Sequence, residues 1–266
     1  MTNYINYVTL AGPMVDYLMA IAGASLTVLT LVMAFDKKPE NATIQPVLIC
    51  SLIVAVVASF IGIHEFSTIS SLELGENVID KTSLGHKNYL ISYPNIAIAA
   101  NFFLMAMLLL TPAFDPESAK FLWNLLVLTF SSLILVQVLW TLESIFLLSK
   151  TVKEGCVIAS LFLVLGLGTF KILLNDTRRR IAKRQPQSLA FMVCMMVSMS
   201  TIFYDIVFPH DFGPLQFKDI CYYALASSLI FASISCLGWL GLTDVHQEMQ
   251  VKLLDSKGNL IESPLN

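Results

Sequence analysis

Long apolar stretches recur along the chain and are separated by short polar segments. Seven of them reach or approach the length of about 20 residues that a helix needs to cross a bilayer. The fourth stretch continues to Leu148 and is interrupted only by Glu143. The pattern predicts one all-α membrane domain over residues 1–243, followed by a short polar cytoplasmic tail over residues 244–266. The seven stretches are Val15–Phe35, Pro46–Phe66, Tyr93–Pro112, Phe121–Leu142, Gly155–Leu174, Ser188–Phe208 and Ile220–Leu242.

Composition supports a membrane protein and excludes several functional classes. Of the 266 residues, 56% are hydrophobic and 13% are charged, whereas soluble domains carry about 25% charged residues. The net charge of −3 provides no basic surface for nucleic acid. The five cysteines lie in or beside apolar stretches without metal-type spacing, so we interpret them as small packing residues.

The distribution of Lys and Arg predicts the orientation of the helices. With the N-terminus outside, eleven basic residues fall on the cytoplasmic side and five on the outer side, which agrees with the positive-inside rule. The first 13 residues lack the basic start of a signal peptide, so we expect the first helix to be retained. We expect the protein in a bacterial inner (plasma) membrane. The five basic residues on the predicted outer side are Lys81, Lys87, Lys150, Lys153 and Lys218.

Ionisable residues gather near the predicted outer ends of the helices. We interpret most of them as polar helix ends, and a metal site formed by His64, Glu65, Asp205 and His210 is the alternative. Lys171, one turn from the cytoplasmic end of the fifth stretch, is expected to extend its ammonium group to the interface. The outer-end residues are Asp16, His64, Glu65, Glu143, Asp205, His210, Asp211 and Asp219.

The polar residues in the middle of the stretches are uncharged. Asn95, Asn101 and Gln137 are the largest of them. We expect them to form hydrogen bonds between helices, with a polar ligand cavity as the alternative. The sequence shows no relay of buried carboxylates or histidines of the kind that a proton pump or antiporter needs. It also shows no hydrolase or phosphate-loop motif, and we expect no enzyme activity.

Three stretches carry residues at spacings typical of one membrane family. The last reads Tyr223-Ala-Leu-Ala-Ser227-Ser-Leu-Ile-Phe231, with Trp239 eight residues later. The sixth begins Gln187-Ser188 and reaches Tyr204, and the third contains Ser92-Tyr93-Pro94-Asn95-Ile96. These segments resemble the microbial (type I) rhodopsins, in particular the proteorhodopsin-like branch. The resemblance covers most of the chain with sparse identities, and it implies a seven-helix rhodopsin-like bundle.

The chain departs from this family at the positions that carry its photochemistry. Phe231 stands where the family has the lysine of the retinal Schiff base, and Ile220–Leu242 contain no lysine. Asn95 and Ser227 stand where the two counterion carboxylates are expected, and Ile96 and Thr201 replace aromatic groups that hold the polyene. The resemblance therefore implies a vestigial retinal pocket formed by Phe231, Asn95, Ser227, Tyr204, Thr201 and Ile96.

These replacements are chemically consistent with one another. Loss of the Schiff-base cation alone would leave buried carboxylates unpaired, at a cost of about 3–5 kcal/mol. Replacement of the carboxylates by neutral residues avoids that cost. The sequence therefore resembles a lysine-less rhodopsin, in which the rhodopsin arrangement would place Phe231 opposite Asn95.

We expect a non-pumping membrane protein that acts by binding or assembly with a membrane partner, as a homo-oligomer or hetero-oligomer. No cofactor is expected. One alternative is a photoreceptor that holds retinal or a carotenoid without a covalent bond, or an ion-transporting rhodopsin. The other is a multi-span subunit of an unrelated transporter or envelope complex.

Overall fold

The computed structural model describes residues 7–34, 44–70, 81–111, 116–181, 188–207 and 217–256. Within these ranges the chain forms seven α-helices and no strand, which confirms the predicted all-α seven-helix bundle. All of these helices except the sixth are longer than the predicted apolar stretches, and the last continues into the segment expected to be a polar tail. They are α1 (Tyr7–Ala34), α2 (Ile44–Ser70), α3 (Lys81–Leu110), α4 (Pro116–Leu148), α5 (Val152–Ile181), α6 (Ser188–Val207) and α7 (Phe217–Ser256).

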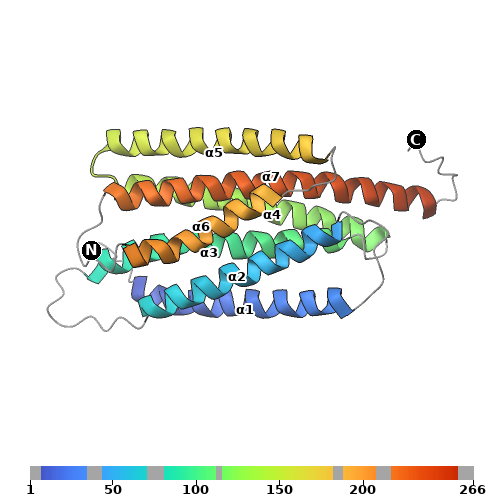
Figure 1. The fold of residues 1–266 in the computed structure, drawn as a ribbon, viewed down its shortest axis with the longest axis horizontal. Coiled ribbons are helices and arrows are strands. Elements are labelled where there is room, and N and C mark those ends of the chain that lie inside the picture. Colours follow the sequence, from blue (N-terminus) through green and yellow to red (C-terminus); the bar gives the residue numbers. More distant parts are fainter. Residues whose placement is uncertain are drawn as a thin grey trace.

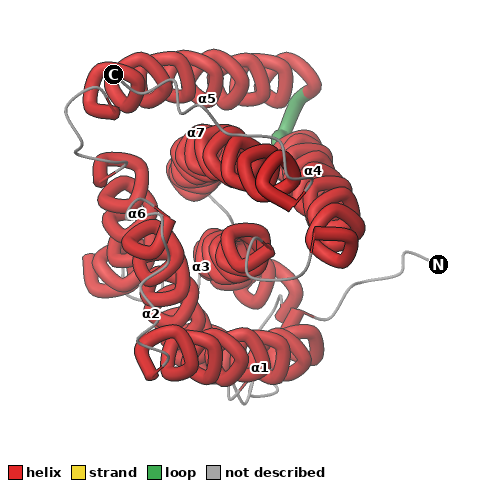
Figure 2. The backbone as a smooth tube through the Cα atoms, turned by 90° about the vertical axis from the view of Figure 1, so that its right-hand side faces the viewer, coloured by secondary structure: helices red, strands yellow, loops and turns green. Residues whose placement is uncertain are grey.

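The helices run roughly along one axis, with α3 in the centre (Figures 1 and 2). α3 packs against α1, α2, α4, α6 and α7. α7 is the second central helix and lies between α3 and α5, while α6 fills the space between α2 and α7. In the most apolar windows of α3 and α7, 78% and 72% of the residues are buried, against 17% in α4 and 22% in α5.

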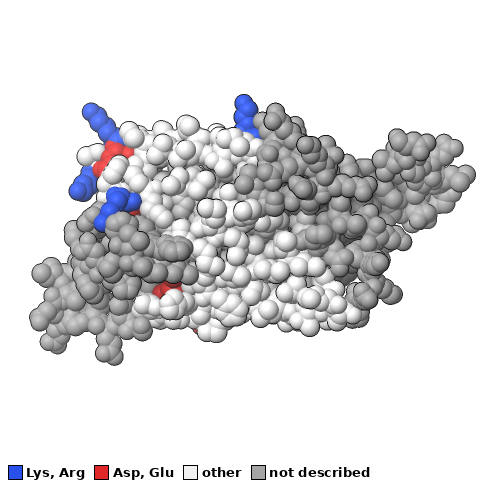
Figure 3. All heavy atoms as spheres, viewed as in Figure 1, with Lys and Arg blue, Asp and Glu red and all other residues white. Residues whose placement is uncertain are grey.

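The outward faces of the peripheral helices are apolar. Large hydrophobic side chains lie exposed along α1, α4 and α5, such as Met33 (70% exposed), Phe121 (69%) and Leu167 (69%). Among the described side chains on the face shown in Figure 3, few are charged, and the middle band is nearly uncharged. A surface of this kind is stable in contact with lipid rather than water. The chain is an integral membrane protein.

Six helices are long and apolar enough within the described residues to cross a membrane. α6 has a shorter described apolar segment, Ala190–Thr201, since the side chains after Thr201 lie outside the described part of the chain. The full α6 helix has 20 residues, which corresponds to about 30 Å of rise. That length matches the hydrocarbon core of a bilayer.

A tight turn joins α4 to α5. The hydroxyl of Thr151 accepts a hydrogen bond from the backbone N–H of Glu154 (3.2 Å), and the Glu154 carboxylate accepts one from the N–H of Lys150 (3.1 Å). This arrangement resembles a capping box, which stabilises the start of a helix. A β-carbon on Gly155 would lie 2.7 Å from the ring of Phe146, so the close approach of the two helices requires glycine there.

Candidate functional site

A buried carboxyl group meets polar side chains of two other helices inside the bundle. Glu65 of α2 is 4% exposed, and Asn95 of α3 is fully buried, as are Ser198 and Thr201 of α6. Helices α2, α3 and α6 pack against one another in all three combinations. We call these four residues the Glu65 cluster.

Hydrogen bonds centred on Asn95 join the Glu65 cluster. The Asn95 Nδ2 group donates to Oε2 of Glu65 at 2.9 Å and to the hydroxyl of Thr201 at 3.1 Å. The Ser198 hydroxyl donates to Oδ1 of Asn95 at 2.6 Å, and the Thr201 hydroxyl donates to the backbone carbonyl of Ser198 at 2.8 Å. Asn95 therefore acts as donor toward α2 and as both donor and acceptor toward α6, which fixes its amide in one orientation.

Small and polar residues allow these helices to approach closely. A β-carbon on Gly62, one turn before Glu65, would lie 2.7 Å from a methyl group of Leu18 and 3.3 Å from Cβ of Asn95. Glycine at this position therefore lets α2 pack closely against α1 and α3. Small residues are used in this way at helix contacts in membranes.

The burial of Glu65 corrects one expectation from the sequence. The sequence pattern places Glu65 among the polar residues at outer helix ends, but its side chain points into the bundle while the neighbouring His64 is exposed. Consecutive residues on a helix are about 100° apart, so the rotation of α2 in the bundle decides which of the two is buried. The side chains of Asp205 and His210, the other proposed participants in an outer-face metal site, lie outside the described residues.

Glu65 also changes the interpretation of the vestigial retinal pocket. The substitutions at Asn95 and Ser227 suggest an interior from which all carboxylates have been removed. The structure instead places a carboxyl group from α2 in hydrogen-bond contact with Asn95. A buried carboxylate is costly inside a membrane, and it can hold a proton or a cation.

Three other residues expected in the vestigial retinal pocket lie outside the Glu65 cluster. Ile96 is 8% exposed and belongs to the main hydrophobic core. Ser227 of α7 faces the buried hydroxyl of Tyr223, together with Thr141 and Ser144 of α4. Tyr204 lies in α6, but its side chain is outside the described residues.

Phe231 lies on the side of α7 that faces α4 and α5. It is 7% exposed and packs edge-on against Phe162 of α5, with ring centroids 5.7 Å apart. Its neighbours belong to a cluster separate from the main core. Asn95 bonds instead toward α2 and α6, so these contacts do not reproduce the expected pairing of Phe231 with Asn95.

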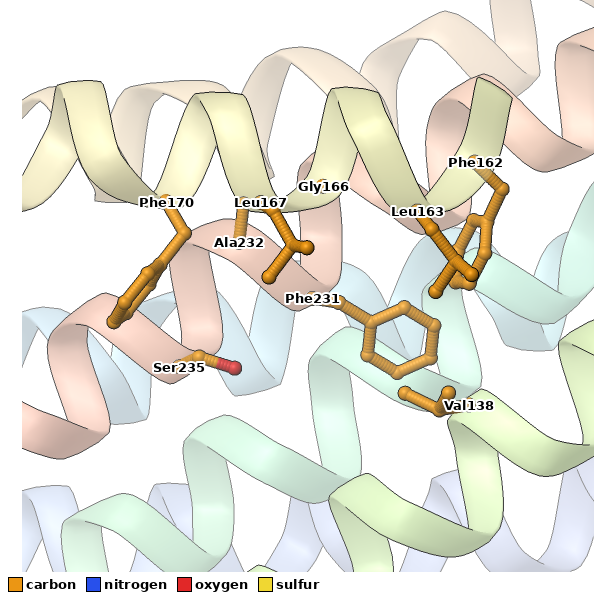
Figure 4. Close-up of a pocket in the computed structure, with 9 residues that line it drawn as sticks. All are labelled: Val138, Phe162, Leu163, Gly166, Leu167, Phe170, Phe231, Ala232 and Ser235. Atoms are coloured by element: carbon orange, nitrogen blue, oxygen red, sulfur yellow. The ribbon is translucent and has the colours of Figure 1, made fainter. Parts of the chain in front are cut away.

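Phe231 lines an apolar pocket of about 260 Å³ between α5 and α7 (Figure 4). Leu163 and Leu167 of α5 border it while remaining 44% and 69% exposed, so the pocket opens on the outer surface of the bundle. The sequence gives no local signal for this pocket, because it depends on how α5 is placed against α7. We call it the α5–α7 pocket, and it is lined by Val138, Phe162, Leu163, Gly166, Leu167, Phe170, Phe231, Ala232 and Ser235.

A second buried polar contact links α3 to α4. The Asn101 Nδ2 group donates to Oε1 of Gln137 at 2.8 Å and to the backbone carbonyl of Ala97 at 2.7 Å. Both side chains are buried, and Oδ1 of Asn101 has no hydrogen-bond partner among the described atoms. This contact agrees with the expectation that the uncharged polar residues join helices.

Metal ligands do not converge in the part of the chain that the structure describes, where no group of three or more His, Cys, Asp or Glu residues is placed to hold an ion.

Comparison with known proteins gives no family assignment. No protein-family model, curated protein or solved structure matches the chain.

Proposed function

We propose that this integral membrane protein is a rhodopsin-like bundle without the chromophore lysine, which acts by binding or assembly rather than by catalysis or pumping. The observation that supports the proposal best is that position 231 carries a phenylalanine and not a lysine. A buried phenyl ring packed against Phe162 occupies the position that the resemblance assigns to the lysine. A side chain without an amine forms no Schiff base, so retinal cannot be attached covalently at this position.

Assembly in the bilayer is supported by the exposed faces of α4 and α5. These helices bury few of their apolar residues within the single chain, and they present them to lipid or to a neighbouring subunit. We propose a homo-oligomer or a hetero-oligomer with a membrane partner in a bacterial inner membrane. An unrelated multi-span subunit of a transporter or envelope complex is the competing interpretation.

A second candidate is a protein that holds retinal or a carotenoid without a covalent bond. The α5–α7 pocket favours it, because the phenylalanine rings of Phe162, Phe170 and Phe231 border the pocket. Pockets for small molecules are usually lined by apolar and aromatic side chains.

The visible spectrum of the purified protein with all-trans retinal tests these proposals. We expect the wild-type chain to show no red-shifted band that hydroxylamine bleaches, and such a band would overturn the leading proposal. A band that resists hydroxylamine but disappears on solvent extraction supports the second candidate.

The variant Phe231→Lys tests the rhodopsin resemblance itself. We expect this variant to gain a hydroxylamine-sensitive band with retinal, with Phe162→Lys, on the facing helix, as the matched control. A band in neither variant, or in both equally, would contradict the alignment of Phe231 with the chromophore lysine and favour the unrelated subunit.

A further inference from the structure

We propose that the α5–α7 pocket is a binding site for an anionic phospholipid, with one acyl chain in the pocket and the phosphate group at Lys171. The proposal rests on the binding role proposed above and gives it a ligand class. It concerns a lipid of the surrounding bilayer, and binding of retinal or a carotenoid in the same place is an outcome of the test.

The pocket has the chemistry and the position that an acyl chain requires. Its described lining is apolar apart from the hydroxyl of Ser235, and it lies within the membrane-spanning parts of α5 (Val152–Leu174) and α7 (Phe217–Trp239). Exposed Leu163 and Leu167 form its lipid-side border. A lipid chain can therefore enter directly from the bilayer without a passage through the bundle.

One face of α5 connects the pocket to the positively charged side chain of Lys171. Leu163, Leu167 and Lys171 follow one another at intervals of four residues, and residues at this spacing lie on the same face of a helix. From Leu163 to Lys171 the helix rises by about 12 Å. A chain lying along the two leucines therefore ends beside the lysine.

Lys171 is suited to hold the head group. Its side chain is exposed, and it lies near the predicted cytoplasmic end of α5, where a long side chain extends its ammonium group to the membrane surface. The segment that follows contains Arg178, Arg179 and Arg180, which gives the same end of the helix a positive balance. Basic residues beside the cytoplasmic leaflet attract anionic lipids by about 1 kcal/mol each.

Phe231 has a defined role in this site. Its ring and that of Phe162 stand at one end of the pocket, and the ring of Phe170 borders the other end (Figure 4). A β-carbon on Gly166 would lie 3.8 Å from the backbone oxygen of Ser228, so α5 and α7 are close there. Phe162 lies farther from Lys171 along α5 than Phe170 does. The rings of Phe162 and Phe231 therefore border the end of the pocket where the end of the acyl chain would lie.

Native mass spectrometry of the full-length protein in mild detergent tests the proposal. The probes are phosphatidylglycerol and phosphatidylcholine with identical acyl chains, compared in the wild type and in Lys171→Gln and Leu167→Ala. Both substituted side chains are exposed, so folding is not at risk. The matched controls are Lys153→Gln and Leu161→Ala, which alter residues of the same helix outside the pocket.

We expect the wild type and both controls to retain phosphatidylglycerol in preference to phosphatidylcholine. Lys171→Gln should reduce that preference about fivefold, which corresponds to the loss of one basic contact. Leu167→Ala should weaken retention of both lipids to a similar degree, because it removes packing contacts with the acyl chain that do not depend on the head group. Equal retention of the two lipids by the wild type, or equal effects of the controls and the pocket variants, would overturn the proposal.

Addition of retinal or a carotenoid gives a further outcome. If either compound displaces the lipid and binds independently of Lys171, the pocket belongs to the polyene and the lipid site is refuted. A Schiff-base band with retinal, by contrast, would overturn the leading functional proposal without affecting lipid retention. The two failures are therefore distinguishable.

Discussion

The amide of Asn95 on α3 donates a hydrogen bond to the buried carboxyl group of Glu65 on α2, with 2.9 Å between Nδ2 and Oε2. Asn95 is fully buried and Glu65 is 4% exposed, so neither group exchanges this contact freely for water. The bond joins two helices at the level where α6 contributes Ser198 and Thr201. Incorrect packing of any of these helices would separate polar groups that find few other hydrogen-bond partners in the bilayer.

Double-mutant analysis should show that Glu65 and Asn95 are coupled. We expect Glu65→Ala and Asn95→Ala each to lower the free energy of unfolding by about 1–3 kcal/mol, because each leaves a buried polar partner behind. The double variant should lose less than the sum of the two. Unfolding of the four proteins in detergent measures this, with Asp16→Ala, a carboxylate of α1 outside the Glu65 cluster, as the control. Additivity within about 0.5 kcal/mol would contradict the coupling.

The Asn101–Gln137 contact should stabilise the packing of α3 on α4 only modestly. We expect Gln137→Leu to cost about 0.6 kcal/mol and at most about 1.7 kcal/mol, the range for hydrogen bonds between membrane helices. The double change Asn101→Leu and Gln137→Leu should be less harmful than the sum, because it removes both buried polar groups. Thr129→Val serves as the control, since the Thr129 hydroxyl donates within its own helix to Leu125. A larger loss in the double variant would show that the pair has another partner.

Gly238 should tolerate no side chain. A β-carbon there would lie 2.5 Å and 2.8 Å from two ring carbons of Phe130, and Phe130 is only 3% exposed. We expect Gly238→Ala to destabilise the protein by about 1–3 kcal/mol through overpacking.

Two further variants test that explanation. Phe130→Leu should restore part of the loss when it is combined with Gly238→Ala, because it removes the ring atoms that clash. Gly168→Ala, where a β-carbon meets nothing within 4 Å, should be neutral or stabilising by up to about 1 kcal/mol. Equal effects of the Gly238 and Gly168 substitutions on thermal unfolding would contradict the close contact between Gly238 and the ring of Phe130.

Reporter fusions should establish the orientation and the role of α6. We expect reporters placed after residues 186 and 266 to be cytoplasmic and a reporter after residue 212 to be outside, because α6 and α7 both cross the membrane. Paired fluorescent and periplasm-active reporters at each position give complementary signals. A reporter after residue 212 on the cytoplasmic side would mean that α6 does not span the bilayer.

The number of helices and their membrane character could be predicted from the sequence. Both depend on the length of apolar runs, which the thickness of the bilayer fixes. The ends of the helices were less predictable: α7 continues to Ser256, although the apolar stretch predicted from the sequence ends at Leu242. Apolar character limits the span, while backbone hydrogen bonds allow a helix to continue into polar sequence.

The candidate site was only partly predictable. A family resemblance singles out Asn95 and Thr201, and the structure brings them together by a hydrogen bond. Their link to Glu65 was not predicted, because nothing local in the sequence distinguishes Glu65 from His64 as the inward-facing residue. A hydrogen bond between residues 30 positions apart exists only once α2 and α3 are packed.

The sequence by itself determined that this chain forms a bundle of apolar helices in a membrane, with a phenylalanine and no lysine in the middle of its last span. Tertiary structure decided the rotation of each helix. It turned Glu65 inward to Asn95, and it turned Phe231 toward Phe162 and the α5–α7 pocket. The physical reason is that helix formation needs only local hydrogen bonds and apolar length, whereas the rotation of a helix depends on side chains that distant segments bring against it.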